Sequence, residues 1–123
     1  MDMKIFFGND ALDILINENC LLDVMLEKIE VSESDNIVIV IFEFKMRPKS
    51  DFEKIRLIFS RVEEYGFYYD KNFLFKTVTE SKFFKTLEGN YYLSLDPFFG
   101  EHNVISDKDA NFVKSQKIEM IVI

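Results

Sequence analysis

Short stretches of alternating apolar and polar residues run along much of the chain, and this period-two pattern predicts half-buried β-strands. The run NIVIVIFEF at 36–44 is β-branched and apolar, and it predicts a strand in the middle of a sheet. The residues SESDN at 32–36 favour a turn before it, because Ser, Asp and Asn side chains bond their own backbone. The segment that begins at Leu22 also alternates and predicts the partner strand of a hairpin, with a bulge between Leu26 and Ile29.

Other strands are predicted near both ends and in the second half of the chain. Gly89, in the sequence LEGN, predicts a turn with positive φ between two of them. The alternation of Tyr91, Leu93 and Leu95 with Tyr92 and Ser94 predicts that the strand after this turn has one buried face. The predicted ranges are 4–8, 73–84, 91–97 and 118–123.

Two segments carry helix signals of different quality. The residues NDALDILINEN at 9–19 predict a brief helix with Asn9 or Asp10 as its N-cap. The residues ISDKDANFVKSQ at 105–116 predict a second helix, which Ser106 opens. Asp107 and Asp109 would lie in its first turn and Lys114 and Lys117 at its end, where each charge suits the helix dipole.

The stretch SDFEKIRLIFSRVEEYG at 50–66 supports two interpretations. Ser50 and Glu53 match a capping box, and Gly66 stands where a glycine commonly follows a helix. The alternation of Ile55, Leu57 and Phe59 with polar or smaller neighbours, and the aromatic residues that follow, suit a strand equally well. The local pattern alone slightly favours the helix.

Together these elements predict an α+β fold with a predominantly antiparallel β-sheet and one or two short helices, in a single domain over residues 1–123. Apolar residues make up 48% of the chain, and 14 Phe with 5 Tyr supply enough large side chains for a core. One cysteine fits a reducing compartment. The first residues lack a secretory signal, and the run IVIVIF at 37–42 is too short to cross a bilayer. We therefore expect a cytoplasmic protein with no membrane partner.

Negative charge is concentrated in the first third of the chain. Residues 1–44 carry ten acidic residues against two lysines, a balance of −8, while the whole chain has a net charge of −7. Such a field repels phosphate backbones and favours an encounter with a basic protein surface. The same surplus of acid also serves to keep a small domain soluble. A basic stretch at 45–61 is interleaved with acidic residues, so nucleic acid is not an expected partner.

Catalytic and metal-binding signals are weak. The only histidine, His102, has Asp96 and Glu101 near it in sequence but lacks the spacing of known metal motifs, and a strand end with a solvated turn is the expected structure. Cys20 lies in an acidic region that does not favour a thiolate nucleophile. The four isolated glycines form no phosphate-binding loop. We therefore predict no catalytic residues, no metal and no cofactor.

The second half of the chain resembles a known protein family. The segments IRLIFSRVEEYGFYYD, FKTVTESKFF, GNYYLSLDPFF and ISDKDANFVKSQKIE are similar to bacterial immunity proteins of polymorphic and contact-dependent growth inhibition toxin systems, over residues 54–119. This resemblance implies a β-rich fold, so strands are expected over 51–65. It also implies that the protein binds and neutralises a cognate toxin domain of the nuclease type by stoichiometric protein–protein binding.

The charge pattern then suggests where such a toxin would bind. Glu30, Glu33 and Asp35 on the first hairpin turn are the predicted contact residues, and Asp96 with Glu101 form a second candidate patch. The chain is expected to be a monomer or a weak homodimer. Two other interpretations stay open: a structural or adaptor domain that dimerises through an edge strand, and a small metal-dependent hydrolase that uses His102.

Overall fold

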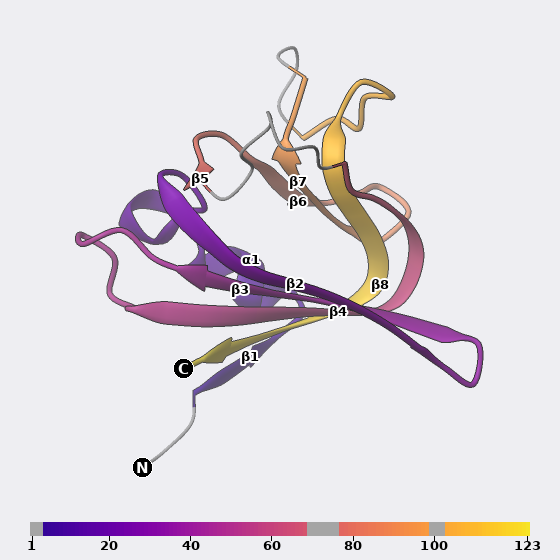
Figure 1. Cartoon of the computed structure of the whole chain (residues 1–123), viewed down its shortest axis with the longest axis horizontal. Coiled ribbons are helices and arrows are strands. Elements are labelled where there is room, and N and C mark those ends of the chain that lie inside the picture. The colour runs from indigo at the N-terminus through magenta and orange to yellow at the C-terminus, as the bar shows by residue number, and fades with distance from the viewer. Residues whose placement is uncertain (1–3, 69–76, 99–102) are drawn as a thin grey trace.

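The computed structural model describes residues 4–68, 77–98 and 103–123, and its strands form one antiparallel sheet that curls into a half-barrel (Figure 1). The strands follow the order β5-β2-β3-β4-β8-β7-β6, and β1 pairs with β8. The coarse prediction of a mostly antiparallel sheet with little helix is confirmed. The elements are β1 (Ile5–Phe7), α1 (Asn9–Ile14), the 3₁₀-helix η1 (Asn17–Asn19), β2 (Val24–Ser34), β3 (Ile37–Lys45), β4 (Lys54–Gly66), β5 (Thr77–Val78), β6 (Lys82–Lys85), β7 (Tyr91–Asp96) and β8 (Ala110–Val122).

Strands β2 and β3 form the predicted hairpin. The turn consists of Asp35 and Asn36, whose φ values of 52° and 63° are those of the type I′ turn that matches the twist of paired strands. The predicted bulge is also present, since the register shifts between Leu26 and Lys28. β3 lies inside the sheet between β2 and β4, as its apolar sequence predicted.

Two long strands, β4 and β8, bend together and divide the sheet into two lobes. Their first pairs join residues 55–60 to 117–122, and their last pairs join residues 62–66 to 112–115. Arg61 has a φ of 52°, and the register shifts between Val62 and Glu64, so the bend falls at a β-bulge. β8 therefore pairs with β1 in the first lobe and with β7 in the second lobe.

The main core lies on the concave face of the sheet. Phe42, Phe44 and Phe59 are fully buried, and the Phe42 ring contacts both others with centroids 5.9 and 5.6 Å apart. The segment after β1 contributes Ala11, Leu15 and Leu21 to the same core. Burial of these large side chains is the main source of stability, because each phenylalanine removes on the order of 150–250 Å² from water.

The second lobe also buries side chains on its other face. Tyr92 lies between Phe84 and Phe112, with ring centroids 5.4 and 6.0 Å from theirs. Tyr92 and Ser94 are buried, as are Tyr91, Leu93 and Leu95, so both faces of β7 are covered. The single buried face that the alternation predicted for this strand is therefore wrong, because Phe84, Phe112 and Asp109 contact Tyr92 on the other face.

Hydrogen bonds join residues 17–19, which lie before β2, to the loop between β3 and β4. Arg47 donates from Nη2 to the Asn17 carbonyl at 2.6 Å and from Nε to the Glu18 carbonyl at 3.1 Å. The Asn19 side chain accepts from Ser50 Oγ and from the Asp51 amide, both at 2.8 Å. These bonds add to the one that the Asn17 carbonyl accepts from the Cys20 amide, and they hold η1 against the loop between β3 and β4.

The predicted helix at 105–116 is wrong. Ser106 accepts a bond from the Lys108 amide at 3.1 Å, and Asp109 Oδ2 accepts one from the Ser106 amide at 3.0 Å. These bonds resemble those at the start of a helix, but the Ser106 hydroxyl accepts from Lys108 and not from Asp109, as a capping box would require. The chain makes only a turn and enters β8 at Ala110. Asp109 cannot continue a helix because its carboxylate is held by groups from β6 and β7.

Other predicted boundaries shift or lie outside the described residues. The strand chosen for 51–65 is confirmed by β4, and Gly89 adopts the predicted positive φ, 92°. α1 begins after Gly8 without a side-chain cap, so neither Asn9 nor Asp10 is its N-cap. Leu22 is exposed and precedes β2. Only 77–78 and 82–84 of the strand predicted at 73–84 form strands, and residues 73–76 lie outside the described part.

Candidate functional site

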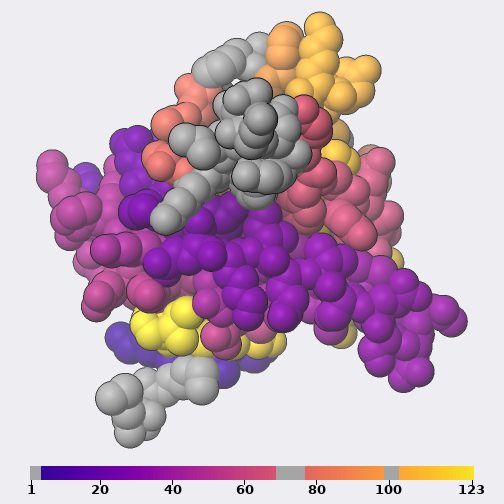
Figure 2. Space-filling view, in the orientation of Figure 1, coloured from indigo at the N-terminus to yellow at the C-terminus, as the bar shows by residue number. Residues whose placement is uncertain are grey.

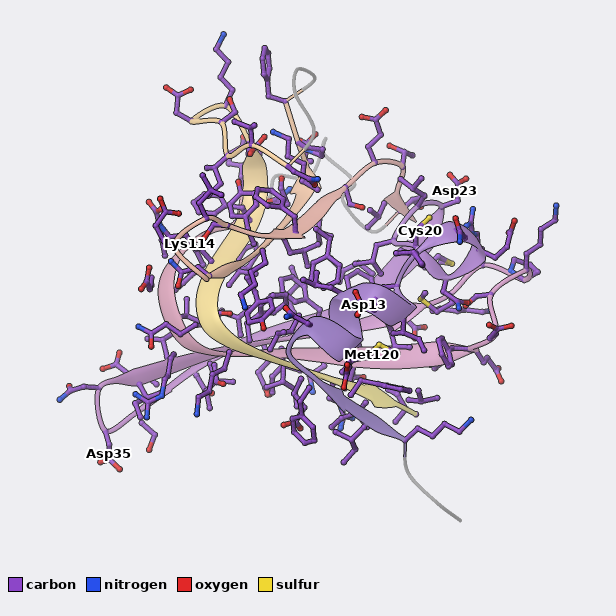
Figure 3. All side chains as sticks on the ribbon, turned by 180° about the vertical axis from the view of Figure 1, so that it is seen from behind. Asp13, Cys20, Asp23, Asp35, Lys114 and Met120 are labelled. Atoms are coloured by element: carbon purple, nitrogen blue, oxygen red, sulfur yellow. The ribbon has the colours of Figure 1, made fainter. Side chains whose placement is uncertain are left out.

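The tip of the β2–β3 hairpin projects beyond the rest of the sheet, and we call residues 30–37 the acidic arm. β3 pairs with β4 only from Val40 to Lys45, so the hairpin extends past the point where β4 bends away. Every residue from Glu30 to Ile37 is exposed. Figures 1 and 2 show the arm as a protrusion, and Figure 3 places Asp35 at its end, away from the other labelled residues.

The three predicted contact residues of the first patch lie on this arm but do not share one face. Glu30 stands opposite Ile41 and Glu33 stands opposite Val38 in the hairpin register, so the two side chains point to opposite faces of the ribbon. Oε1 of Glu30 lies 3.8 Å from Nζ of Lys28, so these two side chains form an ion pair. Within the described ranges, Glu33 and Asp35 form no ion pair. The arm therefore carries uncompensated negative charge at its turn and on the face that holds Glu33.

The second predicted patch does not join the first. Asp96 is exposed at the end of β7, where its amide donates to Ser94 Oγ at 3.4 Å. Figure 1 shows this end of β7 far from the hairpin tip. Glu101 and His102 lie outside the described residues, so the interpretation as a hydrolase that uses His102 is not tested.

Half of the basic residues at 45–61 have partners. Arg56 pairs with Glu43 at 3.0 Å, and Lys54 pairs with Glu27 at 3.1 Å. Arg47 donates hydrogen bonds to two carbonyls of η1, as described above. These contacts join the basic stretch to acidic residues of β2 and β3, and they reduce the positive charge that it presents to solvent.

The surroundings of Cys20 differ from the acidic environment that its sequence neighbours predicted. Its Sγ atom lies 3.4 Å from Nη2 of Arg47, so the thiol has a cationic neighbour despite the acidic sequence around it. Sequence proximity did not reveal this contact, because Arg47 arrives from a loop 27 residues further along the chain.

The second lobe contains a buried cluster of three polar side chains, which we call the Asp109 cluster. Asp109 Oδ1 accepts from Lys82 Nζ at 2.9 Å, and Oδ2 accepts from the Tyr92 hydroxyl at 2.7 Å. The same two oxygens accept from the amides of Phe98 at 2.8 Å and Ser106 at 3.0 Å. The carboxylate thus joins β6 and β7 to both ends of the 98–106 segment.

Burial and hydrogen bonds act in opposite directions on this carboxyl group. Desolvation is the largest influence and raises the pKa of Asp109, but the bonds from Ser106, Lys82, Phe98 and Tyr92 together outweigh it and lower that pKa below its ordinary value. Burial, and then the bond to Asp109, raise the pKa of Tyr92 above its ordinary value. At neutral pH the Asp109 carboxyl group is therefore ionised and the Tyr92 hydroxyl is protonated.

The Asp109 cluster is built for structure rather than for chemistry on a substrate. The Asp109 side chain is completely buried, and that of Lys82 is only 7% exposed. Lys82 also donates to the Val104 carbonyl at 2.8 Å, so its donors point inward. Little of this pair is therefore exposed to a molecule in solvent.

Sequence reasoning missed this cluster, although one signal was available. Lys82 alternates with Phe84 in the strand KFFK, so it shares that residue's buried face. A lysine on a buried face needs a carboxylate or carbonyl partner. That rule would have directed attention to the acidic residues of the 105–109 segment.

The described residues contain no group of three or more His, Cys, Asp or Glu side chains arranged to hold a metal ion. No helix in the described part of the chain is both long and apolar enough to span a bilayer. Comparison with protein-family models, with curated proteins and with solved structures finds no match to this chain. The resemblance to immunity proteins therefore stays a prediction.

Proposed function

We propose that this chain is an immunity protein that binds a cognate bacterial toxin domain of the nuclease type and blocks it stoichiometrically through the acidic arm. The observation that carries the proposal is the exposed arm itself, where Glu33 and Asp35 project on a rigid hairpin without a cationic partner among the described residues. The resemblance of residues 54–119 to immunity proteins supplies the class of partner.

The physical properties of the arm suit the inhibition of a nuclease. A nuclease presents a basic cleft to phosphate groups, and carboxylates on a projecting hairpin satisfy the same cations. The type I′ turn fixes the backbone at Asp35 and Asn36, so little conformational entropy is lost when the arm is bound. Long-range attraction between the acidic first third of the chain and a basic cleft accelerates association at low ionic strength.

Co-expression with the product of the adjacent upstream gene tests the proposal. We expect the two proteins to co-purify in a one-to-one complex and the chain to restore growth of cells that produce the upstream protein. A matched strain that produces a chain with Glu33→Lys and Asp35→Lys should recover growth poorly. An upstream protein that is not toxic, or a toxic one that neither binds this chain nor loses its toxicity, would contradict the proposal.

A further inference from the structure

We infer that the partner docks on the outer edge of β2 by adding one of its own strands, and that this strand is rich in lysine or arginine. This inference rests on the proposed function and specifies how the arm is recognised. An extended partner segment would continue the sheet, and its main chain would bond the amides and carbonyls of β2 that point away from β3.

In the described part of the chain, only β5 pairs with the outer edge of β2. β5 pairs with β2 only at Val24 and Met25, and β2 continues to Ser34. Past Met25, none of the described residues pairs with this edge, which faces the viewer in Figure 2. A strand edge of this length is a ready template for another strand.

The turn determines which main-chain groups the edge offers. In a hairpin closed by two turn residues, the flanking residues form a hydrogen-bonded pair, and such pairs then alternate along the ribbon. Ser34 pairs with Ile37 next to the turn, and the register runs without a shift back to Lys28. The amides that point away from β3 are therefore those of Ile29, Val31 and Glu33.

The side chains along this edge favour a basic occupant. Glu30 lies on one face of the ribbon and Glu33 on the other, so a strand beside β2 meets a carboxylate on both of its faces. Val31 is 41% exposed on the same face as Glu33 and offers one apolar contact. A strand with lysine or arginine on each face and an apolar residue opposite Val31 complements this pattern.

A second copy of the chain is a poorer occupant. Antiparallel self-pairing centred on Glu30 or on Lys28 places like charges directly opposite each other. Pairing centred on Ile29 matches Lys28 with Glu30, but it brings Glu33 of the second copy opposite Met25, a position that β5 already occupies. Each of these three registers therefore opposes an edge-to-edge dimer.

Hydrogen exchange and a proline substitution test the inference on the complex with the upstream gene product. In the wild-type complex, we expect the amides of Ile29, Val31 and Glu33 to exchange at least tenfold more slowly than in the free chain. The amides of Glu30 and Ser32 already bond β3 and serve as internal controls. Val31→Pro should weaken binding at least tenfold more than Val31→Ala, because both remove the side chain but only proline removes the outward N–H.

The possible outcomes separate this inference from the proposed function. A one-to-one complex in which the three outward amides exchange as fast as in the free chain overturns the edge inference and leaves the proposed function intact. Protection of the same amides in the chain alone, together with a dimer by light scattering, overturns it in favour of a second copy. Absence of any complex overturns both proposals. Thermal melting of Val31→Pro and Val31→Ala checks that both fold, and if Val31→Pro does not, the exchange measurement on the wild type decides.

Discussion

The carboxylate of Asp109 lies 2.9 Å from the ammonium group of Lys82, and neither side chain is more than 7% exposed. Both charges have left water, so each depends on the other and on the hydrogen bonds around it. Because Asp109 also accepts from the amides of Phe98 and Ser106, this one pair helps to hold these two residues in place.

Asp109→Asn should lower the free energy of unfolding by about 3–5 kcal/mol, because it leaves the Lys82 ammonium buried without its counter-charge. Urea denaturation monitored by far-UV circular dichroism measures the loss. Asp107→Asn is the matched control, since Asp107 is exposed in the same turn, and it should change stability by no more than about 0.5 kcal/mol. Equal effects of the two variants would contradict the structural role of the Asp109 cluster.

The lowered pKa of Asp109 predicts a component of stability that depends on pH. The unfolded chain, in which this carboxyl has its ordinary value of 3.8, binds a proton at higher pH than the folded chain does. The stabilisation is therefore fully present above this value and is lost as the pH falls through it towards the folded-state pKa. Unfolding free energies measured from about pH 6 to about pH 3 should fall more steeply for the wild type than for Asp109→Asn. Parallel curves would show that Asp109 does not titrate with unfolding.

Gly66→Ala should destabilise the second lobe. A Cβ atom at this position would lie 3.0 Å from Cε1 of Phe112, and that ring is stacked on Tyr92 and cannot move freely. We expect a loss of about 1–3 kcal/mol in urea denaturation, as for other overpacked sites. Phe112→Leu provides room, so the same glycine substitution should have a smaller effect in that background. A loss that is unchanged by Phe112→Leu would contradict the contact with Phe112 as its cause.

Charge reversal on the acidic arm should slow association with the toxin. The double variant Glu33→Lys, Asp35→Lys is expected to reduce the association rate by about tenfold or more at low salt and to flatten its dependence on ionic strength. Stopped-flow mixing of the purified partners measures both quantities. The control variant Asp13→Lys, Asp107→Lys changes the net charge equally at exposed sites off the arm. If both variants slow association alike, net charge matters and the arm does not.

The sequence predicted a strand correctly where neighbouring residues were themselves apolar or alternating. It predicted a helix wrongly where the polar residues of a turn matched the pattern of a helix cap. Ile37–Lys45 alternates or is apolar throughout, so its place inside the sheet followed from its residues alone. The Asp109 carboxylate accepts from the Ser106 amide and the Ser106 hydroxyl accepts from the Lys108 amide, much as at the start of a helix. The next residues nevertheless enter β8, because Asp109 is fixed by Lys82 and Tyr92. Local signals cannot report such distant partners.

The turn before β4 gave a similar false signal. Ser50 Oγ accepts from the Phe52 amide at 3.1 Å, as an N-cap would, but it also donates to Asn19, which is 31 residues away. The acidic arm was recognisable because its turn and charges are contiguous in sequence. The Asp109 cluster was not, because its three side chains come from β6, from β7 and from the residue before β8.

The position of β8 between the two lobes has a consequence for how the protein is made on the ribosome. The β2–β3 hairpin consists of neighbouring residues and can form as soon as it leaves the exit tunnel. β1 and β7, by contrast, both need β8 as a neighbour, and β8 spans residues 110–122. Nascent chains that stop before residue 110 should therefore expose the open edges of β1, β4 and β7, and they are the species that we expect chaperones to bind.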